Sequence, residues 1–309
     1  MVDFSQYLSI KRQVSSYTQE KLVDELQRFS WKFDKLDSVT LSRWEGGKTI
    51  PSKNRQALIF NFFGEMYKYL DDLRNVKIKL PFMMINKRFS TTNFNIDYPY
   101  IESNKGFNLH VEKDREKILK TKFFYDFNEM AYHIPFVYRQ YKYEINLSSS
   151  ISLYSFTDNN DFRLGHFIHA CYEFNTIFKV LTQDMNNHFN KNNLINVSQI
   201  IDLNKNKILL VSSKYTVDLR TTRVMLDITQ QFFLKNPDFN LLITRVIYNE
   251  MASFYLKLGG VIIGQSQEEY NNGVKIGNKK FRWVYIVISA TAILSLNINA
   301  GKQQADAEG

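Results

Sequence analysis

The sequence is poor in the residues that punctuate or cross-link a chain: its 309 residues include 1 cysteine, 5 prolines and 12 glycines. The single thiol, Cys171, cannot form an internal disulfide, which fits a reducing compartment. We interpret Cys171 as a buried, inert thiol. There is no internal repeat and no low-complexity block, so we expect a globular protein.

A long hydrophobic run is also missing. The N-terminus, "MVDFSQYLSIKRQVSS", lacks the apolar core of a signal peptide. The stretch "WVYIVISATAILSLNI", from Trp283 to Ile298, is apolar but shorter than the roughly 20 residues that a membrane span needs. Its first half is β-branched and aromatic, as in a buried strand. We expect a cytoplasmic protein; the alternative is a tail anchor that follows the basic "NKKFR".

What is present is enough apolar residues for two cores and an excess of positive charge. Apolar residues make up 44% of the chain and aromatic residues 15%, which supports two domains in a chain of this length. The formal net charge is +9 and the pI is near 9.3. This excess favours a polyanionic partner, nucleic acid first.

The pattern divides the chain into three parts. Residues 1–75 read as short helices with apolar residues at helical spacing, such as Leu22 with Leu26 and Leu41 with Trp44. Residues 76–115 are turn-rich and are interpreted as a linker or irregular joining structure. Residues 116–309 mix helices and strands, which predicts a layered α/β (α+β) domain.

Several elements are predicted for the third part. We expect helices in "DFRLGHFIHACYEFNTIFKVL" (161–181), "RTTRVMLDITQQFFLKN" (220–236) and "NEMASFYLKL" (249–258). We expect strands in "KILLVSSKYTV" (207–217), "NLLITRVI" (240–247) and around "EEYNNGVKIGNKKFRWVYIVIS" (268–289). A hairpin is expected to turn at Gly277-Asn278.

The stretch "VTLSRWEGGKTIPS" places an acidic residue directly after a tryptophan in a short helix that ends at two glycines. Together with earlier residues it resembles the Cro/repressor-type (XRE) helix-turn-helix DNA-binding domain over about 65 residues. The matching residues are Arg12, Thr18, Gln19, Leu22, Ser42, Arg43, Trp44, Glu45, Gly46, Pro51 and Ser52. This resemblance implies an ion pair between Arg12 and Glu45 beside a buried Trp44. The segment "QRFSWKFDKLD" is longer than the tight turn of that family, so we expect a lengthened loop or an extra helical turn there.

Caps and periodicity supply the DNA-contact hypothesis. Thr18 is expected to cap the second helix, and Asp37 or Ser38 the third. With Leu41 and Trp44 inward, the period turns Ser38, Val39, Ser42 and Arg43 outward, toward a major groove. Arg43 is the best base reader because a guanidinium can bind guanine O6 and N7 together. The resemblance implies that Gln19, Lys48, Thr49 and Asn54 hold phosphates, and Thr18 is counted among the DNA-binding residues. A homodimer on two half-sites is the default.

A second resemblance lies near the C-terminus, in "NEMASFYLKLGGVIIG". Asn249, Tyr255 and Leu258-Gly259-Gly260 are similar to the last third of a GCN5-related N-acetyltransferase (GNAT) domain. The resemblance implies that Tyr255 is a general acid for the CoA thiolate and that Asn249 shapes the CoA cleft. On an amphipathic helix beside Phe254, Tyr255 is otherwise a core residue.

The phosphate-binding turn of that family departs from its pattern here. The expected Q/R-x-x-G-x-G/A stands as "LRTTRVML", with Arg220 first and with Arg223 and Met225 in the glycine positions. Side chains there crowd a pyrophosphate, whereas Arg220, Thr221, Thr222 and Arg223 are phosphate donors themselves. A degenerate acetyltransferase-like domain, an active enzyme and another α/β domain therefore remain open. No cofactor is certain, and acetyl-CoA or another acyl-CoA is what the resemblance implies.

His166 and His169 lie close in sequence to Cys171, but zinc needs three or four converging ligands, so we predict no metal. Our leading hypothesis is a dimeric, sequence-specific DNA-binding transcriptional regulator. Its GNAT-like domain would sense a small molecule, bind a protein partner or mediate dimerisation. The alternative is an active acyl-CoA-dependent N-acetyltransferase that carries a DNA-binding module.

Overall fold

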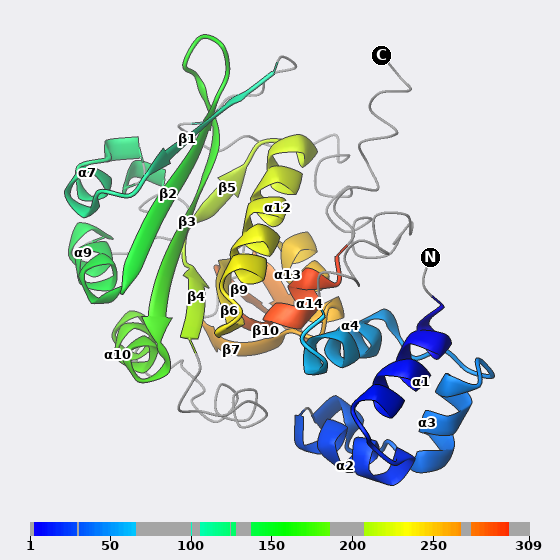
Figure 1. Ribbon diagram of the computed structural model, residues 1–309. Coiled ribbons are helices and arrows are strands. Elements are labelled where there is room, and N and C mark those ends of the chain that lie inside the picture. Colours follow the sequence, from blue (N-terminus) through cyan, green and yellow to red (C-terminus); the bar gives the residue numbers. More distant parts are fainter. Residues whose placement is uncertain are drawn as a thin grey trace.

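The computed structural model describes residues 3–29, 31–65, 100, 106–123, 125–127, 137–185, 207–266 and 273–296. Two expectations lie outside these ranges: the second helix of the segment that starts near residue 52, and the polar run 186–193. Asn54 is in a described helix, but the position of its side chain lies outside the described part. The chain forms a helical N-terminal part and a larger part built around a sheet (Figure 1).

The N-terminal part contains five short helices: α1 (Phe4–Val14), α2 (Gln19–Phe29), the 3₁₀ helix η1 (Trp31–Phe33), α3 (Ser38–Glu45) and α4 (Lys53–Phe62). The hydroxyl of Thr18 accepts a hydrogen bond of 3.1 Å from the backbone N–H of Lys21, so Thr18 caps α2. The Asp37 carboxylate accepts one of 2.6 Å from Thr40 N and caps α3. Hydrogen bonds from Thr40 lower the pKa of Asp37. The extra turn expected between the second and third helices is η1.

Apolar side chains from all four α-helices meet in the centre of this part. Leu8, Leu22, Leu26 and Leu41 are fully buried. Aromatic rings join α1 to α4, since Tyr7 stacks on Phe60 with ring centroids 4.0 Å apart and Phe60 also lies beside Phe4. Leu41 and Trp44 of α3 are part of this core, whereas Val39, Ser42 and Arg43 are exposed.

The second part is a mixed α/β structure. Its strands are β1 (Asn108–Glu112), β2 (Ser150–Thr157), β3 (Arg163–Glu173), β4 (Lys207–Val211), β5 (Lys214–Thr216), β6 (Phe239–Val246), β7 (Val261–Gln265), β8 (Val274–Ile276), β9 (Lys279–Phe281) and β10 (Val284–Ser289). Its helices are α7 (Arg115–Leu119), α9 (Val137–Leu147), α10 (Phe174–Met185), α12 (Leu219–Lys235), α13 (Asn249–Lys257) and α14 (Ala290–Leu294).

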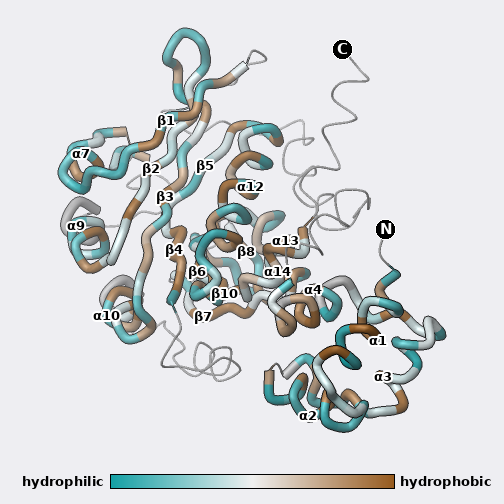
Figure 2. Tube along the Cα trace, viewed as in Figure 1, coloured by the Kyte–Doolittle hydropathy of each residue, from teal (hydrophilic) through white to brown (hydrophobic). Residues whose placement is uncertain are grey.

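Eight strands form one sheet in the order β1-β2-β3-β4-β6-β10-β7, with β5 paired to β3, and β8 and β9 form a separate hairpin. Neighbours in the sheet are antiparallel except β4 and β6, which are parallel and joined through α12. The central strands β4, β6 and β10 are buried along almost their whole length because both of their faces are covered, and β4 is mostly hydrophobic (Figure 2). The sheet is thus the core that positions the second candidate site.

Two side chains of β3 show which helices cover which face. His169 contacts Thr229 of α12, and the hydroxyl of Tyr172 donates to the Glu144 carbonyl of α9. Residues 169 and 172 point to opposite faces because side chains alternate along a strand. Therefore α9 and α12 cover opposite faces of the sheet (Figure 1).

The structure corrects the prediction of a helix over residues 161–181. Residues 163–173 form β3, and the helix α10 begins only at Phe174. Every residue from Leu164 to Tyr172 is buried, and a short, continuous apolar run does not distinguish a buried strand from a buried helix. The range 76–115, interpreted as a linker, also contains β1, whose five residues pair with β2 in the main sheet.

The apolar C-terminal stretch folds into the sheet. Residues 284–289 form β10 between β6 and β7, and α14 follows directly. Within the described ranges, no helix is long and apolar enough to cross a membrane. Figure 1 shows α14 beside α4, so the N-terminal part contacts the second part through these two helices.

Candidate functional site

The outer surface of α3 carries the side chains predicted to read DNA. Val39 is 58% exposed, and Ser42 and Arg43 are exposed as well, while Ser38 is half-buried. In the described part of the chain, no hydrogen bond or salt bridge of the Arg43 side chain is found. The guanidinium therefore stands on the outward face of a short, capped helix and is available to a ligand.

Glu45 fixes this helix to the two before it. Arg12 of α1 donates from Nε to Glu45 Oε1 at 2.6 Å and from Nη2 to Oε2 at 3.2 Å, a two-pronged pair. Gln19 of α2 donates to Glu45 Oε2 at 2.6 Å. The ion pair expected between Arg12 and Glu45 is present, and the amide that we expected on a phosphate is instead engaged with Glu45. These contacts orient α3 relative to α1 and α2.

The other expected phosphate contacts are near this surface. Lys48 and Thr49 are exposed in the turn after α3, where Gly47 has a φ of +66° that favours glycine. Thr18 is exposed, but its hydroxyl caps α2. Arg43 near the end of α3 and the two turn residues are thus all exposed, with the buried Trp44 and the engaged Glu45 between them in sequence.

The second candidate site is the N-terminus of α12, where the resemblance placed a pyrophosphate. Asp218 caps the helix: its Oδ1 accepts from Thr221 N at 2.8 Å and from Thr221 Oγ1 at 2.7 Å. Thr222 Oγ1 lies 2.8 Å from the Asp218 carbonyl oxygen and 2.6 Å from Thr216 Oγ1. Thr221 and Thr222 are fully buried. Arg220 forms an ion pair of 2.8 Å with the same aspartate.

This arrangement does not fit a pyrophosphate. The predicted phosphate donors Thr221, Thr222 and Arg220 are engaged with Asp218, whose negative charge occupies the position where a helix N-terminus attracts an anion. Arg223 is the exception, since its buried Nε has no partner among the described residues and burial lowers its pKa. One guanidinium does not replace a cradle of backbone N–H groups.

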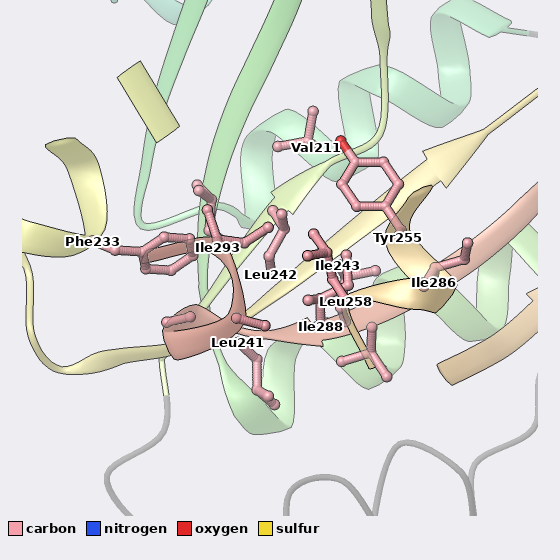
Figure 3. Packing of buried hydrophobic residues seen from close by; sticks show 14 of the residues in the cluster. Val211, Phe233, Leu241, Leu242, Ile243, Tyr255, Leu258, Ile286, Ile288 and Ile293 are labelled. Atoms are coloured by element: carbon pink, nitrogen blue, oxygen red, sulfur yellow. The ribbon is translucent and has the colours of Figure 1, made fainter. Parts of the chain in front are cut away.

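Tyr255 and Asn249 lie on α13 as predicted, but in other environments. Tyr255 is only 2% exposed, and burial raises its pKa well above the usual range. Figure 3 shows its hydroxyl directed toward Val211 at the end of β4. The Lys214 ammonium lies 4.6 Å from the centre of its ring. Asn249 Oδ1 accepts from Lys275 N at 3.2 Å, so its amide holds the β8–β9 hairpin.

Sequence reasoning missed two cations beside this site. Lys214 and Arg245 line a cavity of about 20 Å³ at the ends of β5 and β6, together with residues of α12 and α13. Arg245 is fully buried; it donates to the hydroxyls of Tyr141 and Tyr285 and lies over the Trp283 ring. A cavity of this volume holds about one water molecule. The position of Arg245 inside the apolar run "NLLITRVI" is the sequence signal that could have indicated a buried cation here.

The buried histidines of β3 do not form a metal site. His166 bonds Tyr100 through Nδ1 and Ser213 Oγ through Nε2, the latter at 2.6 Å, and His169 Nε2 lies 3.2 Å from Thr229 Oγ1. Burial lowers the pKa of each to about 3. Cys171 is buried and burial raises its pKa. No cluster of metal-ligating side chains occurs in the described part of the chain.

Comparison with known proteins finds likeness in structure alone. No protein-family model matches the sequence, and no curated protein matches it. Similar solved structures include NAA60 of Arabidopsis thaliana in complex with acetyl-CoA, with 10% identity, 59% of this chain and 98% of that chain covered, and a TM-score of 0.36. Arylalkylamine N-acetyltransferase 2 of Aedes aegypti gives 14% identity, 59% and 99% coverage, and a TM-score of 0.37. An N-acetyltransferase of Staphylococcus aureus Mu50 is 11% identical, with 59% of this chain and 98% of that chain covered and a TM-score of 0.32.

Proposed function

We propose that this chain is a sequence-specific DNA-binding regulator that inserts α3 into the major groove. The observation that supports this function most is the exposed row Val39, Ser42 and Arg43 on a helix whose other face is fixed by Trp44 and Glu45. A base reader must be held by its own scaffold before it meets DNA, because flexible contacts lose affinity when they become ordered.

Each group in this surface has a role in the proposal. Arg43 donates two hydrogen bonds to guanine O6 and N7, and Val39 offers an apolar contact to a thymine methyl group. Lys48 and Thr49 bind phosphates and set the register of the helix in the groove. The resemblance adds Asn54 to the phosphate contacts and Thr18 to the DNA-binding residues. Two protomers read half-sites about one helical turn apart.

The second part, in this proposal, is an acetyltransferase-like domain that has lost its CoA site and serves as a sensor, a partner-binding unit or a dimerisation unit. Support comes from Asp218, which fills the helix N-terminus that a pyrophosphate would need. A ligand of this domain would act on DNA binding through the contact between α14 and α4.

The test is a binding selection with genomic DNA fragments, followed by gel shifts on the selected site and on random DNA over a range of salt. We expect a selected site whose preference persists at salt that weakens phosphate contacts. No preference at any salt concentration contradicts the proposal.

Two variants then locate the recognition helix. Arg43→Ala should lower affinity for the selected site about tenfold to a hundredfold, as expected for the loss of roughly 1–3 kcal/mol of base discrimination, and affect random DNA much less. Lys48→Ala should weaken both DNAs similarly. Equal selectivity losses in the two variants would mean that another surface reads the bases.

The second candidate function is acyl-CoA-dependent N-acetyl transfer, and the sheet favours it. The parallel strands β4 and β6 lie at its centre, α12 joins them, and Tyr255 points to the end of β4. Calorimetric titration with acetyl-CoA and a longer acyl-CoA separates the two candidates. Micromolar binding, and CoA release that disappears in Tyr255→Phe, would support the enzyme. Absence of heat and of a thermal shift supports a domain without a CoA site.

A further inference from the structure

The β8–β9 hairpin is a separate two-stranded element that leaves the main sheet between β7 and β10. Its turn is Gly277-Asn278, and Gly277 at the first turn position has a φ of +59°, as a two-residue II′ turn requires. Val274 and Phe281, which pair across the strands, are buried at 1% and 5% exposure. The inner face of the hairpin is therefore packed against the protein.

The outer face carries two lysines directly opposite each other. Lys275 pairs with Lys280 in the register, and both side chains are exposed. Cβ atoms of directly opposite residues lie about 5 Å apart, and like charges in such a pair destabilise a sheet. Lys279 and the half-buried Arg282 are their neighbours in sequence, and the sequence has no acidic residue from Gly273 to Ser289. Local stability alone does not explain this charge pattern.

The hairpin is held in place from its N-terminal side. The side chain of Asn249, the first residue of α13, accepts the backbone N–H of Lys275. Ser266 Oγ accepts the N–H of Arg282 at 2.8 Å, next to the other end of the hairpin. Both strands are thus fixed at the base, so the lysine pair is presented by a preorganised element and not by a free loop.

We propose that Lys275 and Lys280 form a second nucleic-acid contact, which binds the phosphate backbone of DNA. This inference rests on the proposed DNA-binding function. A phosphodiester relieves the repulsion between the two ammonium groups, and the contact carries no base information because it reaches only phosphates. An anionic membrane is a poorer partner, since membrane-surface elements bury apolar side chains and the outer face presents charge.

The experiment is the salt dependence of DNA affinity for the full chain, with the selected site and with random DNA. Loss of two phosphate contacts in Lys275→Ala/Lys280→Ala should reduce the slope of log K against log salt by about 1.8, at about 0.9 per contact. The loss should be the same on both DNAs. The matched control is Lys117→Ala/Lys120→Ala, which removes the same charge from exposed lysines of α7 and its C-cap, each in a weak 3.9 Å pair. The slope of this control should stay at the wild-type value.

A third variant separates DNA contact from hairpin stability. Lys280→Glu places a carboxylate opposite Lys275, so it should raise or preserve the thermal midpoint while it lowers DNA affinity more than Lys280→Ala does. A purely structural role for the lysines predicts no loss of DNA affinity in this variant.

Three results overturn the inference while the proposed function stands: an unchanged slope, equal slope changes in the hairpin and α7 variants, or lysine-dependent binding to anionic vesicles without a change in DNA affinity. In each case the effect of Arg43→Ala on selectivity is retained. Failure of the wild-type chain to bind any DNA at low salt overturns the proposed function and this inference together.

Discussion

Glu45 explains why an acidic residue follows a buried tryptophan in α3. Trp44 is 4% exposed and belongs to the core of the helical part, which places the next side chain at the boundary between α1 and α2. There the carboxylate receives hydrogen bonds from both Arg12 and Gln19. Three helices are thereby tied through one side chain, and their relative orientation is set by polar geometry as well as by apolar packing.

Arg12→Ala is expected to destabilise the protein by about 3 kcal/mol, because it leaves the Glu45 carboxylate poorly solvated and without its charge partner. The side chains of Arg12 and Glu45 are 18% and 7% exposed, so water screens this pair little. The measurement is urea unfolding of the full chain, monitored by circular dichroism, from which the free energy of unfolding is obtained.

The control for this prediction is Arg28→Ala. Arg28 pairs with Glu25 at 3.1 Å on the surface of α2, where its side chain is 74% exposed, and exposed pairs contribute roughly 0.2–1 kcal/mol at most. Similar destabilisation by the two variants would show that the Arg12 pair has no special role in holding α3.

Among the elements, β3 shows where sequence patterns reach their limit. Caps, glycines and periodicity agree in several elements, which were therefore predictable from the sequence. These are the helices between residues 4 and 62, the strand 239–246, the helices 219–235 and 249–257 and the hairpin at Gly277. In β3 nine consecutive buried residues show no period, and a helix was predicted in error. β1 was missed although "NLHVE" alternates polar and apolar residues, because it has only five residues, is mostly exposed and stands in a turn-rich stretch of sequence.

His166 and His169 of β3 predict a loss of stability in mild acid. In the folded protein the pKa of each is about 3, against about 6.5 in the unfolded chain. Above pH 6.5 neither the folded nor the unfolded chain binds a proton at these histidines, and their full contribution to the free energy of unfolding is present. As pH falls toward 3, the unfolded chain takes up protons that the folded chain does not. The free energy of unfolding should therefore fall by about 1.4 kcal/mol per pH unit for each histidine.

This slope is measured by urea unfolding at steps between pH 6 and pH 5, before carboxylates dominate. Replacing one buried histidine, as in His169→Gln, should remove about half of the slope, and His110→Gln, in the exposed strand β1, serves as the substitution control. Equal slopes in all three proteins would mean that the two imidazoles become protonated in the folded state.

Helix α12 begins after Asp218, an N-cap residue that the sequence shows but that was not predicted. Asp218 precedes "LRTTRVML", and an aspartate in that position is the usual N-cap. Arg220, Thr221 and Thr222 also stand where the acetyltransferase pattern has its phosphate-binding turn, and this position predicted a phosphate role for them. Their contacts with Asp218 are local, within four residues, whereas the bond of Thr222 to Thr216 joins α12 to β5 and depends on the fold.

For Asp218→Ala we expect destabilisation of about 1 kcal/mol, since the α12 cap and the partner of the Thr221 hydroxyl are both lost. Asp218→Asn keeps an acceptor for the Thr221 N–H, so its destabilisation should be only a few tenths of that of Asp218→Ala. Thermal midpoints of the two variants and the wild-type chain provide the comparison. An alanine variant as stable as the wild type would show that Asp218 does not act as the cap.

At the scale of the whole molecule, α4 links the two parts. Four consecutive residues of α4, from Ala57 to Phe60, are buried, and successive residues point about 100° apart around a helix. Helix α4 is therefore covered around most of its circumference, by the N-terminal core on one side and by α14 on another. α14 in turn is held by Gln230 of α12, whose amide donates to the carbonyls of Ile293 and Leu296 at 2.8 and 2.6 Å.

Because α4 is shared, the N-terminal helices and the central sheet should unfold as one cooperative unit. Ile293 of α14 is fully buried, and Ile293→Ala should cost about 2–4 kcal/mol through lost burial and a cavity. Hydrogen exchange followed by mass spectrometry reports each part separately. We expect amides of α2 and of β6 to lose protection by the same free energy in the variant, since both exchange through the same global opening. Loss of protection in β6 alone would show that the two parts unfold independently, and a ligand signal could not then pass from α12 through α14 to α3.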